Sequence, residues 1–322
     1  EEILLRGGHI ALVEGAPRKY TAQRAIRMLG QLVIERRHEF FVPNTQEPGL
    51  YKKYIALGSY RNKVLHLFAQ EALWACALYA LDRNAEKNRN LKKGENAKGQ
   101  NRFYSVSSLL EHVIFLDKLM SFEFVRDRTV TLTDDERKEM HYLVLQKMIQ
   151  RGVFMSTSYQ SIRPGSNLDN YKSKRTVQIA SAASSGVDPY LENLAVTLAP
   201  DGERLFGLLC SIVWPFIDGY YSVSFCLSTL VPPALTQGTK TFMDHVQLFA
   251  EKMYSDGISE FYESCASSTI SNAISSFVSM GVLRKGNPDV IQLGHDYQSQ
   301  QDVEAFLEQI IFFRKGHLGA LS

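Results

Sequence analysis

Residues 60–79 read Y-R-N-K-V-L-H-L-F-A-Q-E-A-L-W-A-C-A-L-Y, which sets a few polar groups into an otherwise apolar segment. At 3.6 residues per turn, the apolar side chains cover most of a helix surface, so the sequence predicts a largely buried helix. A buried imidazole or carboxylate without a hydrogen-bond partner costs about 1 to 3 kcal/mol. We therefore expect His66 and Glu71 to be paired inside the protein or to face a polar partner surface.

Other segments flank this stretch in a characteristic order. They are Met28-Leu29-Gly30 and Glu39-Phe40-Phe41 upstream, and Pro215, Asp218, Tyr220, Thr269, Asn272-Ala273 and the run M-G-V-L-R-K at 280–285 downstream. In order and spacing, these segments together with residues 60–79 resemble the region downstream of the catalytic domain in mitochondrial-type glycerol-3-phosphate acyltransferases. None of them is a well-known motif alone, so the resemblance rests on their sequence order.

The resemblance implies a function for a parent protein and a role for this chain. The parent would move a fatty acyl group from acyl-CoA to the first hydroxyl of glycerol 3-phosphate, giving lysophosphatidic acid, without a cofactor. This chain would be its non-catalytic C-terminal region, which packs on the catalytic domain of the same polypeptide and stabilises it. Acyl-CoA and glycerol 3-phosphate would bind to that domain. The parent would be membrane-associated, on the cytosol-facing mitochondrial outer membrane or, alternatively, at the endoplasmic reticulum or peroxisome.

Two alternatives stay open. The peroxisomal dihydroxyacetone-phosphate acyltransferases share the architecture, although the end Gly319-Ala320-Leu321-Ser322 is not a Ser-Lys-Leu-type address. From a different class, the chain could be a free-standing helical interaction module. Residues 1–6, E-E-I-L-L-R, contain no initiator Met and no targeting signal, so we expect a fragment of a longer polypeptide.

Composition is that of an ordinary globular protein. The 322 residues are 45% hydrophobic and 22% charged, and their length predicts two or three packed units. A net charge of +2 is too small to indicate nucleic-acid or membrane-surface binding by itself. Four widely spaced cysteines form no C-x-x-C pair, which favours reduced thiols in a cytosol-facing protein: Cys76, Cys210, Cys226 and Cys265.

The predicted fold class is mainly α with short β-hairpins. Residues 83–102 contain a single Leu and predict a solvated linker. A weak internal repeat aligns Met148-x-x-x-Gly152-Val153-Phe154 with Phe277-x-x-x-Gly281-Val282-Leu283, and each copy ends a helix before a strand. The predicted parts are a helical unit at 1–82, the linker at 83–103, a winged-helix-like unit at 104–160, an irregular connector at 161–204, and an apolar helix, a second winged-helix-like unit and a C-terminal helix at 205–322.

Two partner classes can be weighed from local sequence. The stretch 205–235 has one charge, Asp218, but Pro215 and Pro232-Pro233 cut it into pieces shorter than the roughly 20 apolar residues of a membrane helix. It therefore predicts a buried core helix. The expected helix at 269–280 has no Lys or Arg, so we expect packing modules and no nucleic-acid binding.

The search for catalytic residues gives one match that we interpret as chance. His112 and Asp117 have the H-x4-D spacing of acyltransferases, but side chains five apart on one helix differ by about 140° and do not readily meet. No catalytic residue and no metal site is expected. Tyr60, Asn62, His66 and Glu71 are the candidate site, as a polar seam against the acyltransferase domain. The alternative for His66 is a core histidine with satisfied hydrogen bonds.

Overall fold

The computed structural model describes residues 65–91, 102–124, 133–158, 191–232, 236–287 and 289–316. The chain divides into two compact units, residues 1–68 and 69–322, and nearly all of the described residues belong to the second. This boundary lies before the one expected at residue 82, because helix α4 begins at Ala69 and continues past it. Residues 32–34, 39–42 and 129–132, whose β-branched and aromatic residues predict short strands, lie outside the described residues.

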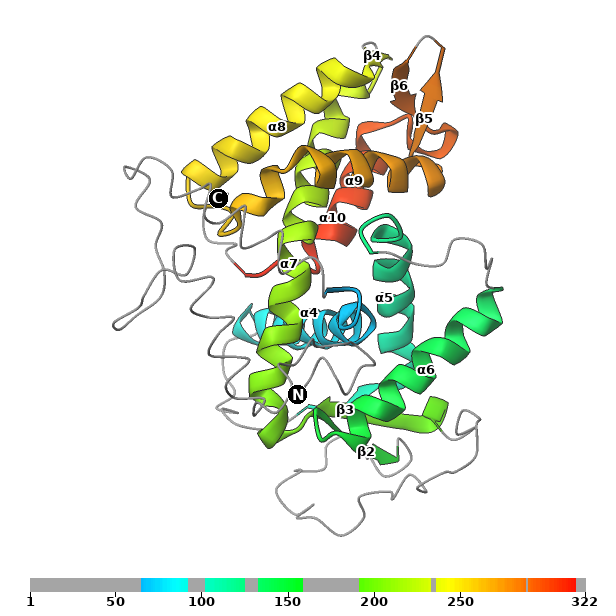
Figure 1. The fold of residues 1–322 in the computed structure, drawn as a ribbon, viewed down its shortest axis with the longest axis vertical. Helices are drawn as coiled ribbons and strands as arrows, with labels where there is room; N and C mark the ends of the chain where they lie inside the picture. The colour runs from blue at the N-terminus through cyan, green and yellow to red at the C-terminus, as the bar shows by residue number, and fades with distance from the viewer. Residues whose placement is uncertain are drawn as a thin grey trace, which may run out of the picture. The chain divides into compact units, whose positions relative to one another are not determined.

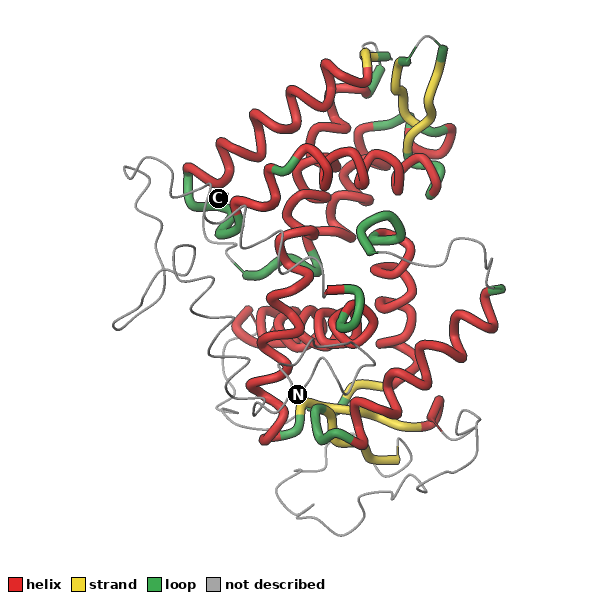
Figure 2. The backbone as a smooth tube through the Cα atoms, in the orientation of Figure 1, coloured by secondary structure: helices red, strands yellow, loops and turns green. Residues whose placement is uncertain are grey.

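The second unit is mainly helical, with seven α-helices and two small antiparallel sheets among its described residues. Figure 2 shows the strands as two separate groups. Figure 1 labels the elements, which are α4 (Ala69–Leu91), β1 (Tyr104–Ser105), α5 (Val106–Leu119), α6 (Asp134–Gln150), β2 (Phe154–Ser158), β3 (Leu194–Leu198), α7 (Glu203–Cys226), β4 (Gln237–Gly238), α8 (Thr239–Ser255), α9 (Ser267–Ser279), β5 (Leu283–Gly286), β6 (Val290–Leu293) and α10 (Gln300–Ile311).

One arrangement occurs twice along the chain. The first repeat, residues 69–198, runs helix, strand, helix, helix, strand, strand from α4 to β3, and its sheet has the order β1-β3-β2. The second repeat, residues 203–293, has the same succession from α7 to β6, and its sheet has the equivalent order β4-β6-β5. Each repeat therefore places its first short strand beside its last.

The backbone bonds at the end of the third helix also repeat. Gly152 and Gly281 both have left-handed φ angles, +69° and +77°, which glycine adopts without steric cost. The next residue donates its N–H to a carbonyl in the last helical turn: Val153 to Met148 at 3.0 Å, and Val282 to Phe277 at 2.9 Å. This is the Schellman arrangement. The repeat predicted from these residues is therefore present in the backbone.

Helix α7 lies at the centre of the core, where it packs on α4, α8, α9 and α10 (Figure 1). It continues without a break through Pro215, so the expectation that proline would divide this segment was wrong. The helical segment 200–230 is long and apolar enough to cross a membrane. However, 72% of its most apolar 18-residue stretch is buried within the protein. The prediction of a buried core helix agrees with this packing.

One local signal is confirmed and two expectations need correction. The run T-D-D-E at 133–136 predicts a helix start with a capping box, and Thr133 does cap α6 with Glu136 completing the box. The predicted linker begins too early, because α4 remains helical to Leu91. The connector expected at 161–204 contains β3, which is the central strand of its sheet.

Candidate functional site

The structure places the predicted seam residues in different surroundings. Tyr60 and Asn62 lie outside the described residues. The side chain of His66 is exposed, so its interpretation as a core histidine was wrong. Glu71 is buried near the start of α4 and accepts a hydrogen bond from Nη1 of Arg151 at 2.8 Å. Arg151 is the C-cap residue of α6, so this ion pair joins the first and third helices of the first repeat.

His112 and Asp117 also have separate partners. The His112 ring packs on Phe312 and Phe313, with centroid distances of 4.9 and 5.8 Å, and burial lowers its pKa. Asp117 is fully buried and accepts a hydrogen bond from Nη1 of Arg137 at 3.0 Å. That this H-x4-D pair is not catalytic stays a prediction, and it is consistent with these surroundings.

Asp117 belongs to a cluster of polar groups between α5 and α6. Its Oδ2 atom lies 3.8 Å from Nε2 of His141, which is also fully buried. Neither ring nitrogen of His141 has a hydrogen-bond partner. An isolated buried carboxylate would be strongly destabilising, and Arg137 supplies a counter-charge to Asp117.

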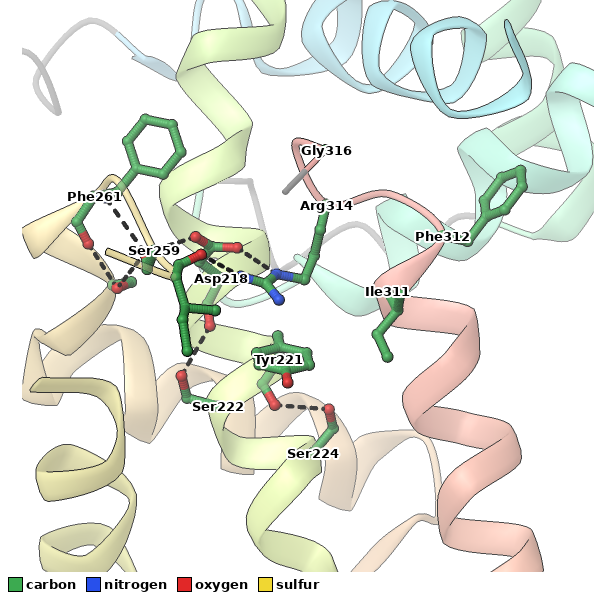
Figure 3. A network of polar contacts seen from close by, with 12 residues as sticks. Asp218, Tyr221, Ser222, Ser224, Ser259, Phe261, Ile311, Phe312, Arg314 and Gly316 are labelled. Carbon is green, nitrogen blue, oxygen red and sulfur yellow. Dashed lines mark hydrogen bonds and ion pairs between the residues drawn. The ribbon is translucent and has the colours of Figure 1, made fainter. Parts of the chain in front are cut away.

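Another buried carboxylate, Asp218 on α7, organises the network in Figure 3. It accepts hydrogen bonds from Nε of Arg314 at 2.7 Å and from Oγ of Ser259 at 2.6 Å. The Arg314 guanidinium also donates to the carbonyl oxygen of Ile258 at 3.2 Å, and it lies 4.0 Å from the centroid of the Tyr221 ring. This charge-assisted network holds the residues after α10 against the middle of α7.

The end of α10 is fixed from α4 as well. The Arg83 guanidinium donates to the carbonyl oxygens of Ile311 and Phe312 at 3.2 and 2.9 Å, and also to that of Arg314. Burial lowers the pKa of Arg83, while the Tyr79 phenol raises it. A cation at this position also interacts favourably with the negative end of the helix dipole. Asp218 and Arg83 therefore bind the closing helix from two different core helices.

The two repeats meet where α9 reaches the end of α5. Ser276 donates its hydroxyl hydrogen to the carbonyl oxygens of Leu119 and Lys118, at 2.6 and 3.2 Å. Asn272 donates to Oε2 of Glu123 at 3.1 Å. Burial raises the pKa of Glu123 to about 7, although the hydrogen bond from Asn272 opposes the shift. This carboxyl group is therefore partly protonated near neutral pH.

A pocket of about 170 Å³ opens where α4, β1, β3 and α7 meet. Its lining consists of Leu78, Tyr79, Asp82, Arg102, Tyr104, Thr197, Leu198 and Phe206. The Tyr104 hydroxyl donates to Oδ1 of Asp82 at 2.8 Å, and burial raises the pKa of this phenol. No histidine or cysteine contributes to this lining. Across the described ranges, no three His, Cys, Asp or Glu side chains are grouped to hold a metal ion.

A family model, the glycerol-3-phosphate acyltransferase C-terminal region, matches residues 1–286. The chain belongs to this family. It is 22% identical to mitochondrial glycerol-3-phosphate acyltransferase 1 of Rattus norvegicus over 310 residues, and equally similar to the Mus musculus and Homo sapiens proteins. Each alignment covers 90% of this chain but 35% of the relative, so the chain spans about a third of the relatives' length.

Two of the residues that carried the family resemblance make polar contacts in the described part of this glycerol-3-phosphate acyltransferase C-terminal region. Asp218 and Asn272 each anchor a contact between distant elements. Sequence reasoning named both residues but missed their partners Arg314, Ser259 and Glu123. A lone charge in an apolar helix signals that Asp218 needs a cation. Nothing local could select a residue 96 positions away.

Proposed function

We propose that this chain is the non-catalytic C-terminal region of a glycerol-3-phosphate 1-O-acyltransferase, which packs on the acyltransferase portion and stabilises it. The parent would transfer an acyl group from acyl-CoA to glycerol 3-phosphate. The family match over residues 1–286 carries the proposal. The names of the relatives support mitochondrial placement, which we extend to the cytosol-facing outer membrane, with the endoplasmic reticulum or peroxisome as alternatives.

A supporting rather than catalytic role fits the chemistry of the described residues. Catalysis of acyl transfer to a hydroxyl needs a general base within reach of that hydroxyl. The described pocket offers Asp82, Arg102 and Tyr104, and its carboxylate already accepts the Tyr104 hydroxyl. The buried carboxylates Asp117 and Asp218 are bound to arginines. We therefore assign these groups to stability.

The two repeats are proposed to be winged-helix-like packing modules. Their succession of helix, strand, helix, helix, strand, strand and their matching sheet orders support this assignment. The third helix of a DNA-binding winged helix would present basic side chains, whereas α9 has no Lys or Arg. Its polar groups Asn272 and Ser276 bind the first repeat instead.

The polar seam remains part of the proposal in a modified form. Tyr60, Asn62 and His66 would face the acyltransferase portion, and the exposed imidazole of His66 supports this. Glu71 would have a structural role within the chain instead, because its carboxylate binds Arg151. Membrane attachment is assigned to the remainder of the parent, because most of the apolar α7 is buried here.

The test is a reconstitution with radiolabelled acyl-CoA. The chain, the acyltransferase portion from the same organism and their mixture are each supplied with glycerol 3-phosphate. We expect no acyl transfer by the chain alone, and higher and longer-lived activity in the mixture than in the acyltransferase portion alone. Supplying dihydroxyacetone phosphate instead distinguishes the alternative acyltransferase class.

A matched variant tests the catalytic assignment directly. His112→Ala in the mixture should leave acyl transfer within about twofold of the wild-type rate, since a general base contributes about 10² to 10⁴. Acyl transfer by the chain alone, abolished by His112→Ala, would refute the proposal. A free-standing interaction module would bind other proteins but leave the acyltransferase portion unaffected.

A further inference from the structure

The internal repeat allows the third helices of the two repeats to be compared residue by residue. Aligning Gly152 with Gly281 pairs Met148 with Phe277, both fully buried. The same alignment defines two corresponding faces, which we call the α6 face and the α9 face. The α6 face consists of Met140, Leu143 and Lys147, and the α9 face consists of Thr269, Asn272 and Ser276.

The α9 face is occupied within the molecule. Ser276 is fully buried and binds two carbonyl oxygens at the C-terminal end of α5, and Asn272 binds Glu123 in the turn that follows. Thr269 is buried against Gly219 of α7. Figure 1 shows α9 lying across this end of α5. The second repeat is therefore joined to the first by a helix face that receives the end of another helix.

The α6 face is open in the described structure. Leu143 is 38% exposed, Lys147 is exposed and Met140 is half-buried. The N-terminal half of α6 extends away from the neighbouring helices in Figure 1. Leu143 and the half-buried Met140 lie beside the exposed Lys147, and together they form a small amphipathic surface. In a repeat protein, each unit buries such a face against its neighbour.

We propose that the α6 face docks on the acyltransferase portion of the parent protein, where it receives the C-terminal end of a helix. This inference rests on the proposed function. Lys147 occupies the position of Ser276, and an ammonium group binds carbonyl oxygens at the negative end of a helix dipole. Leu143 replaces Asn272, so an apolar contact takes the place of the Asn272–Glu123 hydrogen bond.

A second copy of this chain fits the α6 face poorly. The end of α5 is already covered by α9 in every copy. The end of α8 is closed by its own backbone, since Gly257 and Ile258 donate their N–H groups to Tyr254 and Met253. Neither of these helix ends offers free carbonyl oxygens in the pattern that the α6 face would receive.

An anionic membrane also fits poorly, because of the charges on α6. Its N-terminal turns expose four acidic side chains close to the α6 face: Asp134, Asp135, Glu136 and Glu139. Negatively charged lipid attracts basic segments and repels acidic ones. A protein surface that offers carbonyl oxygens to Lys147 and apolar contact to Leu143 and Met140 is therefore the favoured occupant.

The experiment measures the dissociation constant between the purified 322-residue chain and the acyltransferase portion by titration calorimetry. Leu143→Glu and Lys147→Glu alter the α6 face. The matched controls are Leu248→Glu and Lys252→Glu, which change an exposed leucine and an exposed lysine on α8. Circular dichroism must show the same thermal midpoint for all four variants within about 2 °C, as expected for exposed sites.

We expect each α6 variant to weaken binding at least about tenfold and each control to change it less than about twofold. Wild-type affinity in both α6 variants would overturn the docking surface while leaving the proposed function intact. No binding by the wild-type chain would refute the proposed function itself. Two further outcomes would show that the α6 face binds something other than the acyltransferase portion. One is a dimer in sedimentation that Leu143→Glu abolishes, and the other is binding to phosphatidylserine-containing vesicles that Leu143→Glu abolishes.

Discussion

The two repeats share a backbone arrangement but fill its interior differently. In the first repeat, Asp117, Arg137 and His141 form a polar cluster between α5 and α6. The two repeats can be aligned through their glycine turns and through the pairing of β1 and β4 with the central strands. In this alignment Asp117 corresponds to Ala250, Arg137 to Ala266 and His141 to Ile270. Ala250 and Ile270 are fully buried, so the second repeat fills the same space with apolar groups.

This difference shows which features the arrangement needs. Both repeats keep the glycine turn, the backbone bonds behind it and the three-stranded sheet. The cluster of Asp117, Arg137 and His141 has no charged counterpart at the equivalent positions of the second repeat, so the backbone arrangement does not depend on it. Replacing a buried ion pair with apolar groups is often neutral or stabilising, whereas removing one partner is costly.

The largest expected effect comes from removing one partner of the polar cluster. Asp117→Ala should lower the free energy of unfolding by about 3 to 5 kcal/mol, because it leaves Arg137 without its counter-charge. The triple variant Asp117→Ala, Arg137→Ala and His141→Ile, which copies the second repeat, should recover most of this loss. Urea unfolding measures both. A triple variant as unstable as the single one would show that the repeats do not have equivalent interiors.

The contact between the repeats should make stability depend on pH. Burial raises the pKa of Glu123 from 4.5 to about 7, so the folded state binds a proton that the unfolded state has released. The contribution of this group is complete below about pH 4.5 and is lost as pH rises through 7. One pKa unit corresponds to about 1.4 kcal/mol, so the loss is on the order of 3 kcal/mol.

Glu123→Gln provides the matched control for this pH dependence. It keeps an acceptor for Asn272 but cannot ionise. Between pH 5 and pH 8, the free energy of unfolding of the wild type should fall relative to that of the variant, because only the wild type has a carboxyl group that ionises at this position. A difference that stays constant with pH would contradict the raised pKa.

The glycine turns should respond alike in the two repeats. Gly152→Ala and Gly281→Ala each place a Cβ in a left-handed conformation, at a cost of about 1 kcal/mol. Both sites have no neighbouring atom within 4 Å, so the cost is that of the backbone alone. Gly207→Ala in α7 is equally open and helical, and should stabilise by up to about 1 kcal/mol. Unequal losses at Gly152 and Gly281 would weaken the equivalence of the turns.

The smallest effects separate the occupied α9 face from the open α6 face. In the isolated chain, Ser276→Ala should cost about 1 kcal/mol, because its hydroxyl binds the end of α5. Lys147→Ala at the equivalent position should change stability by less than about 0.5 kcal/mol. Thermal unfolding compares the two. A large loss for Lys147→Ala would mean that the α6 face is already engaged inside the chain.

Local signals predicted much of the fold of the described residues. The capping box at Thr133 and Glu136 begins α6, and the glycines at 152 and 281 end the third helices. The hairpin of β5 and β6 follows from the turn residues between the two short strands. These features depend on neighbours within a few residues, so they can be derived without the rest of the chain.

Other predictions failed where distant residues decide the outcome. Proline breaks an isolated helix, yet α7 continues through Pro215 because its apolar surface is buried by four other helices. Residues 83–91 are helical although they have little apolar surface, since α4 is already anchored by its buried N-terminal half, and Arg83 itself binds the end of α10. Local composition carries no information about either stabilising contact.

The sequence by itself determined the family, the helical class, the helix caps, the hairpin and the internal repeat. Each of these is encoded by residue type at short spacing or by segment order. The tertiary structure alone decided that Asp218 binds Arg314, that Glu123 meets Asn272, and that the α9 face is covered while the α6 face is open. The physical reason is that these pairings join residues 96 to about 150 positions apart. Such contacts form by packing of whole elements, which no local pattern records.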